Sequence, residues 1–225
     1  MSNVGFRIYQ HIPRPSKHLI DSFANIPVSN IADTMNRTFC IGDKIRAYNS
    51  ASLVGTAFTV KTRPGDNLML NKAIDMASPG DVIVVEAKGD TSNALIGELM
   101  ITWAQKRGIS GFVIDGAIRD VNHIRNMTIP VYAAGVTPAG PYKDGPGEIN
   151  TPISCGGVTV HPGDILVGDQ DGIVVINPKD APKILERGLK TVAKEEQVMA
   201  DIKDGTWDRK WIDEMLHKKG CEILD

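Results

Sequence analysis

An arginine and an aspartate, Arg119 and Asp120, directly follow a short apolar run that begins at Gly111 and ends through the small residues Gly116 and Ala117. An apolar run of this kind predicts a buried strand, and the residues just after it emerge at the edge of the sheet. A guanidinium and a carboxylate at that edge can bind a ligand, and the small residues before them leave space for it. Adjacent opposite charges are also common as weak surface ion pairs, so the position after the strand is what favours a site.

A second candidate element lies upstream, where Gly97 is followed by Glu98, Leu99 and Met100. If a helix begins at Gly97, its first backbone N–H groups are free to bind a carboxylate or phosphate, and the helix dipole favours such an anion. The alternative is a helix that begins near Ser92 and contains Gly97 as a close-packing residue. Spacing alone slightly favours this second interpretation.

Hydrophobic spacing and turn residues predict an α/β protein with many short strands. Gly108 is suited to end the helix before the strand at Phe112, and Ser29 is the expected N-cap of an early helix. The expected helices are residues 17–24, 29–36, 67–76, 98–106, 178–203 and 207–218, and the expected strands are residues 52–62, 82–86, 112–115, 131–136, 157–160, 165–167 and 173–176.

Residues 139–152 are rich in proline and glycine and predict a loop. Composition alone also allows a linker between two domains, but the strand patterns on both sides are of the same kind. We therefore expect a single domain over residues 1–225, with a helical segment near the N-terminus and a helical extension at the C-terminus. The loop is expected to be ordered, and it could reach a neighbouring subunit.

The composition excludes several classes of partner. The 225 residues are 42% hydrophobic, enough for a substantial core, and the net charge of −2 is spread without a long block of one sign, so no nucleic-acid partner is expected. Cys40, Cys155 and Cys221 are odd in number and lack metal-binding spacing, which suits a reducing compartment and predicts a cytoplasmic protein. No apolar run approaches the ~20 residues of a membrane helix, so no membrane partner is expected either.

Taken together, these motifs resemble the RraA-like family. The resemblance rests on Gly97-Glu-Leu, the Gly-Ala-Ile-Arg-Asp segment that ends at Asp120, Gly135-Val-Thr-Pro, and the Cys-Gly-Gly-Val-Thr-Val-His-Pro-Gly-Asp run that begins at Cys155. The family includes class II, metal-dependent 4-hydroxy-4-methyl-2-oxoglutarate aldolases that also decarboxylate oxaloacetate. The resemblance implies an α/β sandwich with β-β-α layers and a long C-terminal helix, assembled as trimers or hexamers with active sites at subunit interfaces.

The resemblance also implies a role for each candidate site residue. The backbone of residues 97–100 binds the substrate carboxylate, Arg119 contacts the 2-oxo acid, and Asp120 holds a divalent cation, Mg²⁺ or Mn²⁺. Glu98 helps to position a water molecule near Arg119. The chemistry is consistent, because a hard cation chelated by a 2-oxo acid acts as a Lewis acid, and a guanidinium adds positive charge where an enolate develops.

Two further positions concern how complete this site is. Family aldolases commonly have an acidic residue shortly after the Arg-Asp pair, whereas this chain has Asn122 and His123 there. His123 could join a water-mediated metal shell or could simply face solvent. The family also uses a glutamate from a neighbouring subunit's C-terminal helix. Glu195 is the expected match and Glu196 the alternative, although adjacent glutamates on a charged helix are also typical of a solvated face.

Two functions from different classes therefore follow from the sequence. The first is a metal-dependent lyase that releases pyruvate from a branched hydroxy keto diacid or decarboxylates oxaloacetate. The second is a non-catalytic regulator, because the name-giving members of the family bind and inhibit an RNA-degrading endonuclease. Asp120 and Glu98 favour the enzyme, because a pure binding protein has no need of a metal carboxylate.

Overall fold

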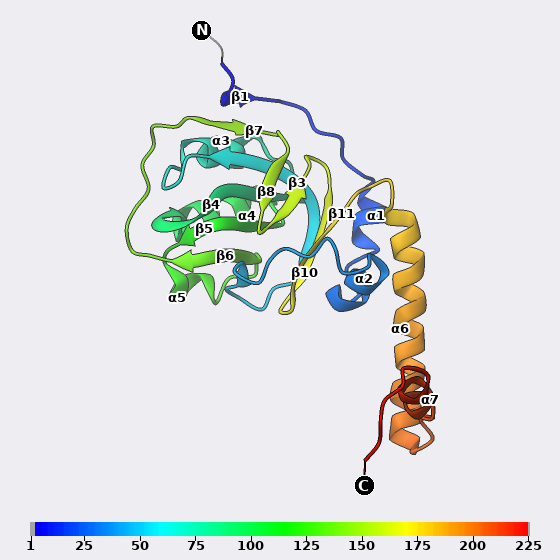
Figure 1. Cartoon of the computed structure of the whole chain (residues 1–225). Coiled ribbons are helices and arrows are strands. Elements are labelled where there is room, and N and C mark those ends of the chain that lie inside the picture. The colour runs from blue at the N-terminus through cyan, green and yellow to red at the C-terminus, as the bar shows by residue number, and fades with distance from the viewer. Residues whose placement is uncertain (1–2, 225) are drawn as a thin grey trace. The chain divides into compact units, whose positions relative to one another are not determined.

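The computed structural model describes residues 3–224 (Figure 1). The chain consists of two compact units, Met1–Gly188 and Leu189–Asp225. The first unit contains both candidate site elements. The second contains most of the long helix α6 (Ala181–Asp204) and the helix α7 (Trp211–Lys218). Both helices were expected from the sequence, within a few residues at each end. The expectation of one domain with a helical extension stays a prediction.

A nine-stranded sheet forms the centre of the first unit. Its strand order is β1-β7-β3-β4-β5-β6-β2, and β10 and β11 continue from β3 as an antiparallel pair. The four central strands, β3 to β6, are parallel to one another. The strands of this sheet are β1 (Phe6–Ile8), β2 (Arg46–Ala47), β3 (Leu53–Thr62), β4 (Asp81–Ile96), β5 (Gly111–Ile118), β6 (Val131–Val136), β7 (Gly147–Ile149), β10 (Ile165–Asp169) and β11 (Gly172–Ile176).

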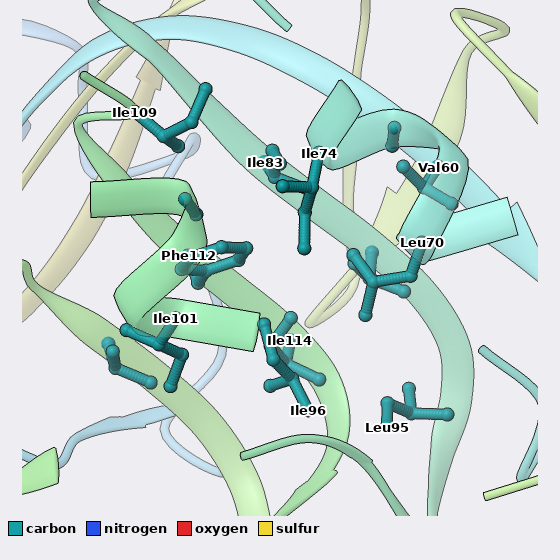
Figure 2. Close-up of a cluster of buried hydrophobic side chains, with 14 of the residues drawn as sticks. Val60, Leu70, Ile74, Ile83, Leu95, Ile96, Ile101, Ile109, Phe112 and Ile114 are labelled. Atoms are coloured by element: carbon teal, nitrogen blue, oxygen red, sulfur yellow. The ribbon is translucent and has the colours of Figure 1, made fainter. Parts of the chain in front are cut away.

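Helices α3 (Leu68–Met76) and α4 (Glu98–Lys106) cover one face of this sheet. Their apolar side chains, among them Leu70, Ile74 and Ile101, pack on alternate residues of the central strands such as Ile83 and Phe112, and all five are almost completely buried (Figure 2). Alternate residues of a strand point to opposite faces, so a strand covered on both faces must be apolar throughout. This requirement explains the continuous apolar runs in β4 and β5.

The other face packs against the β10–β11 pair and against a small two-stranded sheet of β8 (Ile153–Cys155) and β9 (Val158–Val160). Its core contains the remaining strand residues, such as Val84, Val113 and Tyr132. The protein therefore has a layer of strands, the central sheet and a layer of helices, in that order. This arrangement confirms the predicted α/β fold class and its β-β-α layering.

Two sequence-based expectations about the elements were wrong, and one expected strand proved longer than expected. Ser29 does not cap a helix, because α2 (Val28–Thr34) begins one residue earlier, with Pro27 at the cap and no side-chain cap bond. The expected loop over residues 139–152 contains β7, which is stabilised by pairing with β1 and β3, two partners distant in sequence. The strand expected at residues 82–86 is the first part of β4, which continues to Ile96 beside β5.

Two short helices complete the first unit, α1 (Lys17–Asp21) near the N-terminus and α5 (Val121–Ile124) directly after the candidate Arg-Asp pair. Among residues 3–224, none of the helices combines the length and the low polarity that a bilayer span requires.

Candidate active site

The candidate site forms where β4 and β5 end side by side and α4 begins. Ile96 pairs with Ile118, which holds both chains extended to the sheet edge, and α4 starts at Glu98 with Gly97 as its N-cap. The interpretation that a helix begins near Ser92 is therefore wrong. Residues 92–96 have enough helix-compatible side chains, but strand pairing with β5 decides their conformation.

Asp120 links the end of β5 to the start of α4. Its Oδ2 accepts a hydrogen bond of 3.0 Å from the backbone N–H of Glu98. Asp120 itself has left-handed backbone angles, φ 61° and ψ 34°, which are uncommon for a residue other than glycine and recur at functional sites. Arg119 lies next to it, with Nε 3.7 Å from the same carboxylate oxygen. The two side chains are 44% and 40% exposed, so this contact is not a buried ion pair.

The first turn of α4 offers unused backbone donors. An α-helix leaves its first N–H groups without intrahelical partners, and here the intrahelical ladder begins with Ile101, which donates to the Gly97 carbonyl. Glu98 donates to Asp120, and within residues 3–224 the N–H groups of Leu99 and Met100 have no acceptor. Two free donors and the positive end of the helix dipole therefore lie beside Arg119. This combination is suited to bind a carboxylate.

These groups line an open pocket of about 340 Å³. The structure brings together five of the predicted site residues in the lining of this pocket, namely Gly97, Leu99, Met100, Arg119 and Asp120. The other lining residues, which no sequence pattern predicted, are Asn67, Asn71, Pro141 and Lys143. They come from the start of α3 and from the loop before β7, and no local pattern indicates that these segments meet α4.

Glu98 lies beside His123, the residue that stands where family aldolases commonly have an acidic side chain. Its Oε1 lies 3.3 Å from Nδ1 of His123, and the two side chains are 39% and 65% exposed. Because His123 is on α5, directly after Asp120, this contact forms a second link between α4 and the end of β5. A glutamate at the start of α4 can orient a water molecule near Arg119.

Glu195 and Glu196 lie on α6 in the second compact unit, so the pocket of the first unit is described without them. Their participation in an active site stays a prediction, as do the roles expected for the residues of the pocket.

The donor set around Asp120 fits a hard cation held mainly by water and substrate. Among the residues that the structure describes, no three His, Cys, Asp or Glu side chains are grouped as metal ligands. A zinc site of three protein ligands therefore does not fit. Mg²⁺ commonly binds through one or two carboxylates and keeps several waters, and Asp120 Oδ1 remains for such a contact because only Oδ2 accepts the Glu98 N–H.

The fold and the pocket define an α/β protein with a small surface pocket at the sheet edge where parallel strands end. The model of the RraA-like family, described as Aldolase/RraA, matches residues 28–175. A protein of Halalkalibacterium halodurans, provisionally named 4-hydroxy-4-methyl-2-oxoglutarate aldolase, is 40% identical over 200 residues, which cover 88% of this chain and 95% of the relative. The chain belongs to the RraA-like family.

Solved structures agree on the fold. An uncharacterised protein from Pseudomonas syringae has a TM-score of 0.78 at 24% identity, with 87% of this chain and 92% of that chain covered. An unusual member of the RNase ES inhibitor RraA protein family, from Streptomyces coelicolor, has a TM-score of 0.75 at 26% identity, with 82% and 96% covered. The names of these relatives thus include both an aldolase and a ribonuclease inhibitor.

Proposed function

We propose that this protein is a divalent-metal-dependent carbon–carbon lyase, a class II pyruvate aldolase. Its substrate is 4-hydroxy-4-methyl-2-oxoglutarate or a related hydroxy keto acid, and it also decarboxylates oxaloacetate. The observation that carries the proposal is the pocket that Leu99 and Met100, whose N–H groups have no acceptor among residues 3–224, share with Arg119 and Asp120. The aldolase name of the 40% identical relative supports the same reaction class.

Each group of the pocket has a task in this reaction. The substrate hydroxyl loses its proton, the C3–C4 bond breaks, its electron pair passes to the enolate of pyruvate, and the enolate takes up a proton at C3. The N–H groups of α4 hold the C1 carboxylate, and the Arg119 guanidinium stabilises the negative charge that develops on the keto oxygen. Glu98, whose Oε1 lies 3.3 Å from Nδ1 of His123, orients the water that removes the hydroxyl proton.

Asp120 is the residue that would hold a divalent cation, Mg²⁺ or Mn²⁺. When bound there, the cation supplies Lewis-acid polarisation of the 2-oxo acid. The same carboxylate accepts the Glu98 N–H, so it also keeps the start of α4 in place against the end of β5.

We also propose that the active protein is a homo-oligomer, a trimer or a hexamer, in which Glu195 of one subunit reaches the active site of its neighbour. We propose the cytoplasm as its location. Leu99, a leucine at the mouth of the pocket, is 82% exposed in the single chain, and an apolar side chain in this position is suited to contact a second subunit. Light scattering in solution measures the subunit number, and a monomer would contradict this part of the proposal.

The direct test is pyruvate release from 4-hydroxy-4-methyl-2-oxoglutarate and from oxaloacetate, measured with Mg²⁺ and then with a chelator. Asp120→Asn is the informative variant, because an asparagine oxygen can still accept the Glu98 N–H but carries no charge for a cation. We expect the chelator and Asp120→Asn each to abolish both activities, whereas the control Asp43→Asn, at an exposed aspartate, retains them. Activity that survives both treatments would refute metal-dependent lysis.

The role of Glu98 can be separated from that of Asp120 by comparing the two reactions. Decarboxylation requires no removal of a hydroxyl proton, whereas aldol cleavage does. Glu98→Gln should therefore impair aldol cleavage more than oxaloacetate decarboxylation. Equal losses in the two assays would contradict the proposed role.

The alternative function is a non-catalytic regulator that binds and inhibits a ribonuclease, and the name of the Streptomyces coelicolor relative favours it. It predicts that the purified protein slows RNA cleavage by an RraA-sensitive endonuclease, and that Asp120→Asn inhibits as well as the unchanged protein. Inhibition together with no pyruvate release would replace the lyase proposal by this one.

A further inference from the structure

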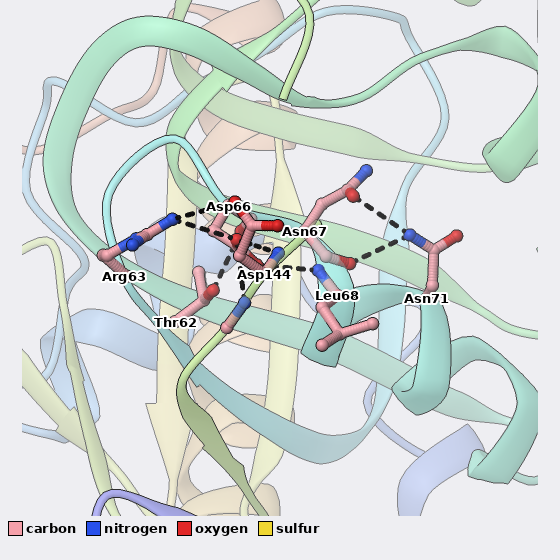
Figure 3. A network of polar contacts seen from close by, with 8 residues as sticks. Thr62, Arg63, Asp66, Asn67, Leu68, Asn71 and Asp144 are labelled. Carbon is pink, nitrogen blue, oxygen red and sulfur yellow. Dashed lines mark hydrogen bonds and ion pairs between the residues drawn. The ribbon is translucent and has the colours of Figure 1, made fainter. Parts of the chain in front are cut away.

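The loop that forms one wall of the pocket is fixed by a buried carboxylate. Asp66 is 0% exposed, and its Oδ2 accepts hydrogen bonds from the backbone N–H groups of Asp144, at 2.7 Å, and Gly145, at 2.9 Å. Its Oδ1 accepts the N–H of Leu68 at 2.9 Å, so the same side chain holds the start of α3 (Figure 3). Lys143 directly precedes these anchored residues.

The backbone on the other side of Lys143 is fixed as well. Tyr142 donates its N–H to the Gly65 carbonyl at 2.8 Å and accepts the N–H of Asn67 at 3.0 Å. Earlier in the loop, the Asn93 side chain donates to the Gly140 carbonyl at 2.6 Å. The position of Lys143 is therefore set by bonds on both sides, and only its flexible side chain remains free to follow a ligand.

Lys143 is a cation that the fold leaves unpaired. It is exposed, and within residues 3–224 no acidic side chain or other acceptor bonds to it. The neighbouring Arg63 is different, because it lies 3.4 Å from Asp66 and 3.7 Å from Asp144 (Figure 3). Lys143 nevertheless lines the same pocket as Arg119, and Gly140, in the same loop, lies against the Arg119 guanidinium.

We propose that Lys143 binds the distal carboxylate of a dicarboxylic substrate and so determines which hydroxy keto acids the site accepts. The inference rests on the proposed lyase function. One carboxylate, next to the keto group, is held by the N–H groups of α4, and the second is held across the pocket by the ammonium of Lys143. The preferred substrates are therefore diacids, and analogues with an uncharged end bind more weakly.

The chemistry gives this subsite a kinetic signature. In aldol cleavage the distal carboxylate leaves with the second carbonyl product, and its charge is the same in the bound substrate and in the transition state. Lys143 therefore contributes uniform binding, so its loss raises KM and leaves kcat nearly unchanged. Loss of a residue that only supports the fold would lower kcat/KM for every substrate, diacid and monoacid alike, with a fall in kcat.

The test compares 4-hydroxy-2-oxoglutarate with 4-hydroxy-2-oxopentanoate, which has a methyl group in place of the distal carboxylate. For Lys143→Gln we expect the KM of the diacid to rise about tenfold, with kcat and both constants of the monoacid changed by less than about twofold. Lys143→Arg should restore most of the diacid preference. The control is Lys72→Gln, at an exposed lysine of α3 that does not line the pocket. Equal KM changes for both substrates, or no change for the diacid, would overturn the proposal.

A binding measurement keeps this result separate from the lyase proposal. 2-Oxoglutarate and 2-oxopentanoate differ in the same way and have no hydroxyl group that could be cleaved, and calorimetry in the presence of Mg²⁺ gives the dissociation constant of each. Weaker binding of 2-oxoglutarate alone to Lys143→Gln supports the subsite even if no substrate releases pyruvate. Unchanged binding of 2-oxoglutarate overturns the subsite even if the unchanged protein is an active lyase.

Discussion

Gly97 allows the sharpest test of how the site is built. Its backbone is extended, with φ −148° and ψ −170°, so an alanine there would meet no conformational penalty. The obstacle is space. A β-carbon at this position would collide with Oδ2 of Asp120 and would lie 3.0 Å from Cγ and 3.2 Å from Nε of Arg119. Carbon atoms in contact prefer a separation of about 3.5–4.0 Å, so both side chains must move by roughly 1 Å.

The expected effect of Gly97→Ala on catalysis is much larger than its effect on folding. A misplacement of about 1 Å at reacting groups can lower the rate about 100-fold, so kcat/KM for pyruvate release should fall by this order. The displaced side chains are 44% and 40% exposed and can move toward solvent. Loss of the bond from Glu98 N–H to Asp120 should therefore lower the free energy of unfolding by only about 1 kcal/mol.

The assay combines steady-state kinetics with thermal unfolding. Gly188→Ala on α6 is the matched control, because the nearest atoms to its new β-carbon are side-chain carbons of Ile26 at 3.4 Å, an ordinary contact. Alanine in a helix interior is favoured over glycine by about 0.5–1 kcal/mol, so the control should be slightly stabilised and fully active. Full activity of Gly97→Ala, or an activity loss that accompanies unfolding, would refute the reasoning.

Three further predictions concern groups outside the pocket. Burial and the neighbouring Glu86 carboxylate raise the pKa of Asp115. Between the ordinary and the raised pKa, the folded protein keeps a proton that the unfolded chain has lost. The free energy of unfolding therefore falls as pH rises through this interval. Asp115→Asn should therefore raise Tm by about 2–3 °C at pH 7 and by less at pH 4, and a gain equal at both values would contradict this. Burial also raises the pKa of the Cys155 thiol, so iodoacetamide should modify the exposed Cys40 and Cys221 of the native protein and spare Cys155. Mass spectrometry measures the labelling, and equal labelling of all three cysteines would contradict this prediction. Arg14 donates from Nε and Nη2 to the buried carboxylate of Asp81 at 2.9 and 2.8 Å. Arg14→Ala should therefore lower the free energy of unfolding, measured by denaturant titration, by about 2 kcal/mol. A change below about 0.5 kcal/mol would show that this ion pair does not stabilise the fold.

The length of β4 shows where local patterns stop being informative. The sequence predicts a strand over residues 82–86, and directly after it Lys88 and Gly89 have positive φ angles of 59° and 68°. The chain then returns to the sheet, however, with register shifts between Glu86 and Asp90 and again before Ile96. A bulged continuation depends on the partner strand β5, so no local signal announces it.

The two halves of the candidate site differ in the same way. Arg119 and Asp120 are contiguous and directly follow a strand, so the sequence alone places them at a sheet edge. Gly97 could be interpreted in two ways, because only the pairing of Ile96 with Ile118 decides that the helix begins after it. The hydrophobic pattern over residues 98–106 agrees with the observed helix but does not exclude an earlier start.

Lys143 is the case that no sequence pattern could have revealed. It lies in a glycine- and proline-rich loop, 24 positions after Arg119 in the printed sequence, and lysines in such loops are usually only solvated. What sets it apart is Asp66, a buried carboxylate that pairs with Arg63 at 3.4 Å and whose oxygens accept backbone N–H groups from two separate segments. Burying a carboxylate is unfavourable unless it is well bonded, so this arrangement makes the conformation of the loop specific. A folded chain can thus hold a flexible, unpaired cation at a fixed point of the pocket wall, and substrate selectivity can depend on a residue that no local pattern connects to the reacting groups.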